Sequence, residues 1–181
     1  MKVTPTAIPD VLLIEPTVFV DERGFFFESY SERTFARALG IECRFVQDNQ
    51  SRSKRDVLRG LHYQVVRPQA KLVRCIAGEV LDIAVDLRRS SATFGKWVSF
   101  KLDDVRGHTA YIPAGFAHGF VVRSASADIL YKTSDFYFPE FDRCIAWNDP
   151  DLAIDWQLEG LPILSEKDRA GAKFRDAEVY P

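Results

Sequence analysis

The sequence predicts an all-β sandwich or barrel with a few short peripheral helices. Its apolar residues recur mostly with a period of two, which is the spacing of a strand with one buried face. The strand-like runs are short, are separated by Gly, Asp, Pro or Ser clusters, and do not alternate with helices as βαβ units do. No repeat, low-complexity tract or linker divides the chain, so we expect one domain over residues 1–181.

Two short helices are expected outside the strands. The side chain of Ser31 can cap a helix that runs to Leu39, and Gly40 can end it. Near the other end of the chain, Ser165-Glu-Lys-Asp168 has the S-x-x-D form that starts helices. Both segments are therefore predicted to be helical and peripheral.

The strand-like runs are densest between residues 72 and 133. Leu72–Ile76 and Val80–Leu87 flank Ala77-Gly78-Glu79, which predicts a hairpin. In the second run Asp82 and Asp86 fall on the face opposite the alternating apolar residues. Further strands are predicted at Trp97–Leu102, Ala110–Ile112, Gly119–Arg123 and Ile129–Thr133.

Composition and charge narrow the class of protein. The chain has 24 Lys+Arg against 26 Asp+Glu, a net charge of -2, and is 46% hydrophobic and 13% aromatic. This apolar content excludes a disordered chain, and its length allows a sizeable core. A near-neutral total argues against a nucleic-acid partner, whose backbone needs a surplus of cations. A local basic cluster could still hold one small anion.

The cysteines and the apolar runs indicate a compartment. Cys43, Cys75 and Cys144 are odd in number and lack a C-x-x-C spacing, which favours free thiols in a reducing cytoplasm over a disulfide scaffold or a zinc site. No apolar run approaches the length of a membrane span, and prolines at 5, 9 and 16 interrupt the N-terminal segment. We expect a cytoplasmic protein with no membrane partner.

Polar residues among the strands mark a candidate site. On a strand over residues 59–64, Gly60, His62 and Gln64 share one face, and Arg59 shares the other with Leu61 and Tyr63. If residues 65–70 form the connecting loop, Gln64 pairs with Lys71, and Lys71 falls on the face of His62. A change of register by one residue would move the lysine to the other face.

A second pair follows from the same counting. If residues 124–127 form a turn, His118 and Tyr131 lie on the same face of two paired strands. Polar side chains that project into a barrel must find partners or serve a ligand. Two histidines, a lysine and a tyrosine on inward faces therefore indicate a site within the barrel.

Each of these residues also has an ordinary structural explanation. A strand histidine is more often a hydrogen-bonded structural residue than a catalyst, and a buried tyrosine usually bonds the backbone. Asp168 is explained by the capping box, and Arg23 by a turn. Only their combination favours a functional site.

Metal and nucleotide motifs are weak or missing in the sequence. His62, His108 and His118 show no H-x-H or H-x-x-x-H spacing, and the residue two after His62 is Gln64, a poor ligand, so no metal site is predicted. The sequence has no G-x-G-x-x-G, G-x-x-x-x-G-K-[ST] or G-x-S-x-G motif.

Six ordered segments resemble one enzyme family, the dTDP-4-dehydrorhamnose 3,5-epimerases. The resemblance runs from about Ile8 to Arg169. The segments are Asp21-Glu-Arg-Gly-Phe-Phe-Phe-Glu28, Phe45-Val-Gln-Asp-Asn49, Arg59-Gly-Leu-His-Tyr-Gln64, Pro113-Ala-Gly-Phe-Ala-His-Gly-Phe120, Tyr131-Lys-Thr133 and Ser165-Glu-Lys-Asp-Arg169.

The resemblance implies a cupin-type jelly roll that works as a homodimer without a metal or organic cofactor. The implied substrate is a dTDP-4-keto-6-deoxy sugar, dTDP-4-dehydro-6-deoxy-D-glucose, which is inverted at C3 and C5 to dTDP-4-dehydro-L-rhamnose. The protons at C3 and C5 flank the C4 ketone, so removal of either gives an enolate with its charge on the C4 oxygen. The implied reaction is therefore proton abstraction and reprotonation through an enolate.

The resemblance also implies roles for individual residues. His62 is similar to the general base, with Asp168 as its carboxylate partner, and Tyr131 to the acid on the opposite face of the sugar. Lys71 would stabilise the enolate oxygen. The implied substrate-binding residues, with Phe26 and Tyr137 as candidates for stacking on thymine and the cations for the diphosphate, are Arg23, Phe26, Glu28, Gln47, Asn49, Arg59, His118, Tyr137, Asp142 and Lys167.

Two departures from the family pattern leave alternatives open. Position 50 is Gln where His is common in the family, and the segment 136–142 differs from its usual form. The alternative reactions are inversion at only C5 or only C3, or a 3,4-ketoisomerisation on the same fold. A metal-dependent cupin enzyme and a non-catalytic sugar-binding cupin are the remaining alternatives.

Overall fold

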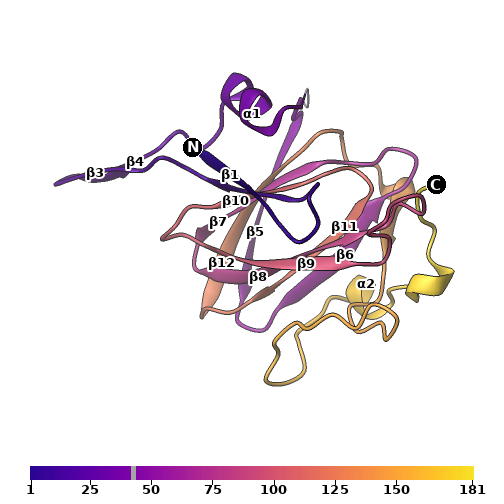
Figure 1. The fold of residues 1–181 in the computed structure, drawn as a ribbon. Coiled ribbons are helices and arrows are strands. Elements are labelled where there is room, and N and C mark those ends of the chain that lie inside the picture. The colour runs from indigo at the N-terminus through magenta and orange to yellow at the C-terminus, as the bar shows by residue number, and fades with distance from the viewer. Residues whose placement is uncertain (42–43) are drawn as a thin grey trace.

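The computed structural model describes residues 1–41 and 44–181, and most of its strands lie in two antiparallel sheets that pack face to face (Figure 1). Cys43 lies outside the described residues, while Cys75 and Cys144 are free thiols. None of the helices in these two ranges is long and apolar enough to cross a membrane. The predicted all-β architecture is confirmed.

The first sheet has the strand order β1-β2-β10-β7-β12-β5 within the described residues. Its strands are β1 (Lys2–Pro5), β2 (Leu12–Glu15), β5 (Gln47–Lys54), β7 (Lys71–Ala77), β10 (Thr109–Ile112) and β12 (Ser126–Thr133). The second sheet has the order β13-β6-β11-β8-β9. Its strands are β6 (Leu58–Gln64), β8 (Glu79–Asp86), β9 (Trp97–Asp103), β11 (Phe116–Val122) and β13 (Asp142–Cys144).

The remaining elements lie outside the two sheets. A two-stranded ribbon, β3 (Phe19–Asp21) and β4 (Gly24–Phe26), extends away from the body of the molecule (Figure 1). The helices are α1 (Glu32–Leu39), α2 (Glu166–Arg169) and the 3-10 turns η1 (Pro139–Phe141) and η2 (Phe174–Asp176).

Both predicted helices form, with the predicted caps. The Ser31 side chain accepts a hydrogen bond from the backbone N–H of Thr34, and Gly40 ends α1 in the left-handed conformation with φ +67. The Ser165 side chain accepts from the backbone N–H of Asp168 and so caps α2. α1 packs Phe35 against the outer face of the first sheet.

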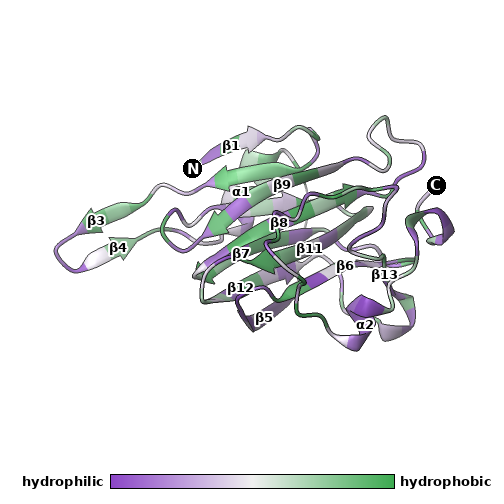
Figure 2. Cartoon of the chain, turned by 90° about the horizontal axis from the view of Figure 1, so that it is seen from below, coloured by the Kyte–Doolittle hydropathy of each residue, from purple (hydrophilic) through white to green (hydrophobic). Residues whose placement is uncertain are grey.

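Apolar residues are buried on both faces of the sheets. Figure 2 shows that much of the hydrophobic sequence lies in their strands. The inner cluster takes residues from both sheets, such as Val73 of β7, Ala84 of β8 and Phe120 of β11. The outer face of the second sheet is covered by the C-terminal segment, which contributes Trp156. The alternation predicted for β8 holds, since Ala84 faces inward while Ile83 faces the outer cluster.

The three strand pairings predicted from the sequence are wrong. β7 does not form a hairpin with β8, β6 does not pair with β7, and β11 does not pair with β12. Instead, β7 lies between β10 and β12, and β11 lies between β6 and β8. Both edges of each strand are therefore occupied by strands from elsewhere in the chain.

The physical reason lies in the crossovers of the fold. Neighbours in sequence usually pair, but in this fold the consecutive strands β6 and β7, β7 and β8, and β11 and β12 lie in opposite sheets. Gly78, with φ +77, makes the corner between β7 and β8, and a Cβ there would lie 2.1 Å from the Ser126 carbonyl oxygen. The chain consequently changes sheet at Gly78, where the sequence pattern predicted a hairpin turn.

Candidate active site

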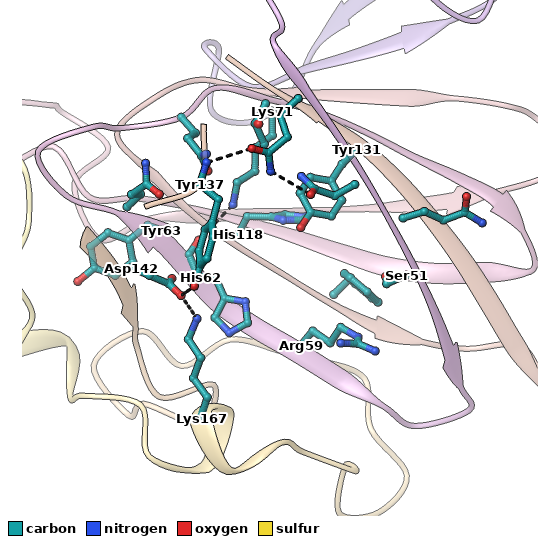
Figure 3. Close-up of a pocket in the computed structure, with 17 residues that line it drawn as sticks. Ser51, Arg59, His62, Tyr63, Lys71, His118, Tyr131, Tyr137, Asp142 and Lys167 are labelled. Carbon is teal, nitrogen blue, oxygen red and sulfur yellow. Dashed lines mark hydrogen bonds and ion pairs between the residues drawn. The ribbon is translucent and has the colours of Figure 1, made fainter. Parts of the chain in front are cut away.

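A cavity of about 380 Å³ opens between the inward faces of the two sheets (Figure 3). Ten of the predicted site residues line it, and they come from β5, β6, β7, β11, β12, β13 and α2 and from the segment between β12 and β13. They are Gln47, Asn49, Arg59, His62, Lys71, His118, Tyr131, Tyr137, Asp142 and Lys167.

His62 is held by a buried carboxylate at the back of this cavity. Its Nε2 lies 2.7 Å from Oδ1 of Asp168, and its side chain keeps 32% of its surface exposed while that of Asp168 keeps 3%. The same Asp168 oxygen accepts the backbone N–H of Gly60 at 3.1 Å, and Oδ2 accepts the Ser165 hydroxyl at 2.6 Å. The capping box of α2 therefore fixes the carboxylate that orients the histidine.

The titration of this pair follows from its surroundings. Burial lowers the pKa of His62 below its usual value, and the hydrogen bond that its imidazole donates to Asp168 opposes this shift. Burial alone would raise the pKa of Asp168, but its hydrogen bonds with His62, Ser165 and the Gly60 N–H hold it at about 2. At neutral pH the pair is a neutral imidazole beside a carboxylate, the state of a general base.

Lys71 reaches the cavity from the opposite sheet. Its side chain is buried, and its Nζ donates to the His62 carbonyl oxygen at 3.4 Å. Burial lowers the pKa of Lys71 to about 8, with Asp142 and Asp82 opposing the shift. The predicted proximity to His62 is confirmed, although the lysine arrives across the sandwich, paired with Ile112 and Thr133.

Tyr131 also belongs to the first sheet, and it pairs with Asn49 on β5 and Val73 on β7. His62 belongs to the second sheet, so the imidazole and the phenol enter the cavity from opposite walls (Figure 3). Burial raises the pKa of the Tyr131 hydroxyl, which stays protonated at neutral pH. The cavity thus has a base on one wall and a proton donor on the other.

His118 sits opposite His62 on the neighbouring strand and is bound to a carboxylate of its own. Its Nε2 lies 2.9 Å and 3.1 Å from the two oxygens of Asp82, which is fully buried. Asp82 had no place in the site predicted from the sequence. The sequence did contain a signal for Asp82, because it lies on the face of β8 opposite the alternating apolar residues.

Three of the predicted residues, Tyr137, Asp142 and Lys167, contact one another at the cavity. Asp142 Oδ2 accepts the Tyr137 hydroxyl at 2.9 Å and is ion-paired with Lys167 (Figure 3). The backbone N–H of Tyr137 donates to the side chain of Gln47, which in turn donates to Asn49 at 3.0 Å. These contacts connect the segment 136–142 with β5.

Arg59 shows where strict alternation was wrong. It was predicted to face away from His62, but it lines the same cavity, and its Nε donates to Ser53 at 3.0 Å. The pairing of β6 with β11 shifts between His118↔His62 and Phe120↔Arg59, so four residues on β6 (59–62) span three on β11 (118–120). Such an irregularity turns the next side chain to the other face.

Three predicted residues lie outside the cavity of their own chain. Arg23 and Phe26 belong to the projecting ribbon, and Glu28 follows it; all three are exposed. Arg23 pairs with Asp21 at 2.5 Å. The cavity is also lined by residues that were not predicted to belong to the site: Gln50, Ser51, Tyr63, Gln64, Gln69, Phe120 and Thr133. For Gln64 the signal was its predicted place on the same strand face as His62.

One group among the described residues could hold a metal ion. Ligand atoms of His62, Cys144 and Asp168 all lie within 4.8 Å of one another. The cavity as a whole combines a neutral imidazole, a buried ammonium and a phenol. This set can remove a proton beside a carbonyl group, stabilise the resulting enolate and return a proton from the other side.

Comparisons with known proteins show which family the chain resembles. A family model described as dTDP-4-dehydrorhamnose 3,5-epimerase matches residues 5–176. The dTDP-4-dehydrorhamnose 3,5-epimerase of Pseudomonas aeruginosa is 61% identical over 181 residues and is covered over 100% of both chains. That of Escherichia coli is 53% identical over 170 residues, which is 93% of this chain and 91% of that protein.

A solved structure gives the same result in three dimensions. The crystal structure of dTDP-6-deoxy-D-glucose-3,5-epimerase from Legionella pneumophila, in complex with dTDP-4-keto-L-rhamnose, matches with a TM-score of 0.95 and 48% identity. The match covers 98% of this chain and 94% of that one. The predicted cupin-type jelly roll is confirmed by this likeness.

Proposed function

Because the chain belongs to the dTDP-4-dehydrorhamnose 3,5-epimerase family, we propose that it inverts C3 and C5 of dTDP-4-dehydro-6-deoxy-D-glucose to give dTDP-4-dehydro-L-rhamnose. The observation that carries this proposal is the convergence of the His62–Asp168 pair, Lys71 and Tyr131 on one cavity. The bound dTDP-4-keto-L-rhamnose of the Legionella relative supports the same substrate class.

His62 acts as the base in this proposal. The neutral imidazole takes the proton from C3 or C5, and Asp168 holds the ring and stabilises the imidazolium that forms. The buried carboxylate is already ionised, so proton transfer requires no further desolvation there. The low pKa of Asp168, about 2, means that the proton stays on the imidazole until it is released.

Lys71 provides the charge that the intermediate requires. Proton loss places negative charge on the C4 oxygen, and an ammonium fixed beside that oxygen stabilises the transition state more than the ground state. Its burial makes the interaction strong, because little water screens it. Removal of one such preorganised group costs about 100-fold to 1000-fold in rate in other enzymes.

Tyr131 returns the proton. Inversion requires delivery to the face opposite the one that lost the proton, and Tyr131 stands on the opposite sheet from His62. The raised pKa of its hydroxyl keeps the proton available at neutral pH. The cations Arg59 and Lys167 and the aromatic Tyr137 at the cavity are proposed to hold the nucleotide part of the substrate.

We further propose that the protein works as a homodimer in which the ribbon completes the partner's site. Arg23 and Phe26 were expected to bind substrate, yet the ribbon carries them away from their own cavity (Figure 1). The ribbon is apolar and exposed, with Val20 77% and Phe26 70% accessible. An exposed apolar element of this kind favours packing against another subunit.

A reducing compartment is the remaining part of the proposal. Cys75 and Cys144 are free, and neither thiol has a cysteine partner among the described residues. Free thiols are typical of proteins that work in the cytoplasm. We accordingly infer a cytoplasmic enzyme.

Proton exchange in D₂O tests the proposed reaction. The enzyme is expected to incorporate deuterium at both C3 and C5 of the dTDP-4-keto-6-deoxyglucose substrate, as followed by NMR. Uptake at one carbon only would show a single-site epimerase, and movement of the ketone would show a 3,4-ketoisomerase. Binding without any exchange would overturn the enzymatic proposal and leave a sugar-binding protein.

A further inference from the structure

We propose that the epimerase carries an inhibitory site for a borderline-soft divalent cation such as Zn²⁺, formed by His62, Cys144 and Asp168. The inference rests on the proposed function in one respect, because inhibition follows only if His62 is the base. Binding of the ion itself does not depend on that assignment. The site needs no side chain beyond those that the fold already brings together.

Strand pairing creates the ligand set. Cys144 on β13 pairs directly with His62 on β6, and Asp168 reaches the same histidine from α2. The donor atoms of the three side chains lie within 4.8 Å of one another. An imidazole nitrogen, a thiolate sulfur and a carboxylate oxygen are the three ligand types that Zn²⁺ takes in proteins.

The ligands are supported and remain accessible. Asp168 is held by Ser165 and by the Gly60 N–H, so its carboxylate is oriented before any ion arrives. Hydrogen bonds of this kind to a ligand raise metal affinity. The side chain of His62 is 32% exposed and lines the cavity, which gives an ion a path to the site. Three protein ligands leave the fourth tetrahedral position for water.

Charge in and around the site is close to balanced on binding. Coordination removes the thiol proton of Cys144, which passes to solvent, so the thiolate and the Asp168 carboxylate match the two charges of Zn²⁺. Two ammonium groups, Lys71 and Lys167, lie close enough to influence His62. Lys167 is already ion-paired with Asp142, which offsets part of its repulsion.

The bound ion blocks the chemistry rather than assisting it. A metal on Nε2 of His62 replaces the hydrogen bond between this nitrogen and Asp168. The single proton of the neutral ring then resides on Nδ1, so His62 keeps no nitrogen lone pair that could take the substrate proton. The sequence did not reveal this site, because ligand spacing was judged along the chain, whereas Cys144 approaches His62 only through the β6–β13 pairing. Zinc is accordingly expected to inhibit, and a chelator to restore activity.

A second thiol provides a matched control. Cys75 is buried, and its Sγ donates to the carbonyl oxygens of Ala77 at 3.1 Å and Gly78 at 3.2 Å. It belongs to no metal-ligand group among the described residues. Cys75→Ala therefore changes the thiol content without touching the proposed site.

Cobalt absorption and zinc inhibition test the proposal separately. Wild-type protein and Cys75→Ala, titrated with Co²⁺, are expected to show a thiolate-to-cobalt absorption band that Cys144→Ala lacks. Zinc is expected to inhibit wild type and Cys75→Ala, while Cys144→Ala tolerates at least about tenfold more zinc. Cys144→Ser is the second variant, and without zinc both Cys144 variants are expected to retain epimerisation.

The outcomes distinguish the two proposals. A cobalt band that persists in both Cys144 variants, or equal zinc sensitivity of wild type and these variants, would overturn the metal site. A Cys144-dependent band in a protein that shows no exchange in D₂O would instead sustain the metal site and refute the epimerase assignment. Epimerisation by a protein that shows no thiolate-to-cobalt band would sustain the epimerase assignment and refute the metal site.

Discussion

Asp168 Oδ1 lies 2.7 Å from Nε2 of His62, although 106 residues separate the two along the chain. Asp168 is at the same time the third residue of α2: its backbone N–H donates to the side chain of the N-cap Ser165, and its carboxylate accepts the Ser165 hydroxyl. One short helix near the C-terminus therefore provides the carboxylate that orients His62. In the proposed mechanism this contact makes a peripheral segment part of the site.

Replacement of Asp168 by Asn is expected to lower epimerisation by about 100-fold or more, because a carboxamide can neither hold the imidazole as a carboxylate does nor stabilise the imidazolium. The rate of C5 deuterium exchange measures the effect. Glu159→Gln, an exposed change on the C-terminal segment, is the control and should leave the rate unchanged. A wild-type rate in Asp168→Asn would remove Asp168 from the mechanism.

In the proposed mechanism, kcat/KM is expected to fall at both low and high pH, and a different residue causes each decline. His62 acts as the neutral base, and burial lowers its pKa, so activity is lost only when pH falls below the usual histidine range. Lys71 acts as the cation, with a pKa of about 8, so activity is lost as pH rises through that value.

Variants at Lys71 check the basic limb of that profile. Lys71→Met removes the charge at every pH and is expected to cost about 100-fold in rate. Arg keeps its charge over the accessible range, so residual activity of Lys71→Arg should no longer decline near pH 8. A wild-type profile that stays flat or rises from pH 7 to 9 (about one unit either side of the value for Lys71) would contradict the assignment of the cation.

The sequence predicted the class of fold, both helices with their caps, and the pair of faces of β8. These features are local: they depend on period two, on Ser31 and Ser165 as caps, and on Gly40 as a stop. Strand pairing is not local, and every pairing inferred from neighbouring runs was wrong. The packing of the whole core decides which strands cross between sheets, and a short segment of sequence carries no information about that packing.

Ten of the predicted site residues nevertheless line one cavity, for a physical reason. Inward faces of both sheets point into the same cavity, so Lys71 meets His62 whether it arrives from a paired strand or across the sandwich. What could not be predicted was the contact of Asp82 with His118, the proximity of Cys144 to His62, and the inward turn of Arg59. Each depends on a strand partner or a register shift that the alternation of residues does not contain.

Tyr131→Phe is expected to separate proton loss from inversion. The variant keeps His62 and Lys71, so the substrate should still exchange deuterium, but the delivery from the opposite wall is lost. Inversion is expected to slow by about 100-fold or more while exchange with retained configuration continues. NMR of the product sugar in D₂O reads both. Full 3,5-inversion by this variant would refute the acid role.

Mixing two inactive variants tests the dimer. If the ribbon binds substrate in the partner's site, a mixed dimer contains one complete site. That site has His62 from the Arg23→Ala subunit and Arg23 from the His62→Ala subunit. A mixture of equal parts, refolded or exchanged together, should then recover about a quarter of wild-type sites. Each variant alone should stay inactive or strongly impaired.

The contrary results of that mixing experiment are clear. No recovery in verified mixed dimers would place Arg23 in its own subunit's site or outside the mechanism. Sedimentation as a monomer at assay concentration would exclude the exchange altogether. Arg106→Ala, whose side chain binds Asp103 far from the cavity lining, is a charge-matched control and should be fully active alone.

Asp86 is expected to contribute strongly to stability without touching the site. It is fully buried and accepts hydrogen bonds from Arg88, Ser91 and Thr93, the last two at 2.6 Å. Burial alone would raise its pKa, but these bonds hold it at about 2. Since the unfolded chain titrates near ~3.9, the stabilisation is present above that pH and is lost as pH falls toward 2.

Asp86→Ala is accordingly expected to lower the free energy of unfolding by about 3–5 kcal/mol, because it leaves the Arg88 guanidinium without its buried partner. Urea unfolding at pH 7 measures the loss. Asp10→Asn removes the exposed partner of the same arginine, 2.7 Å away, and should change stability by less than about 1 kcal/mol. Two results would contradict this prediction. One is an equal loss of stability in the two variants. The other is a wild-type free energy of unfolding that does not decrease when the pH is lowered below about 4.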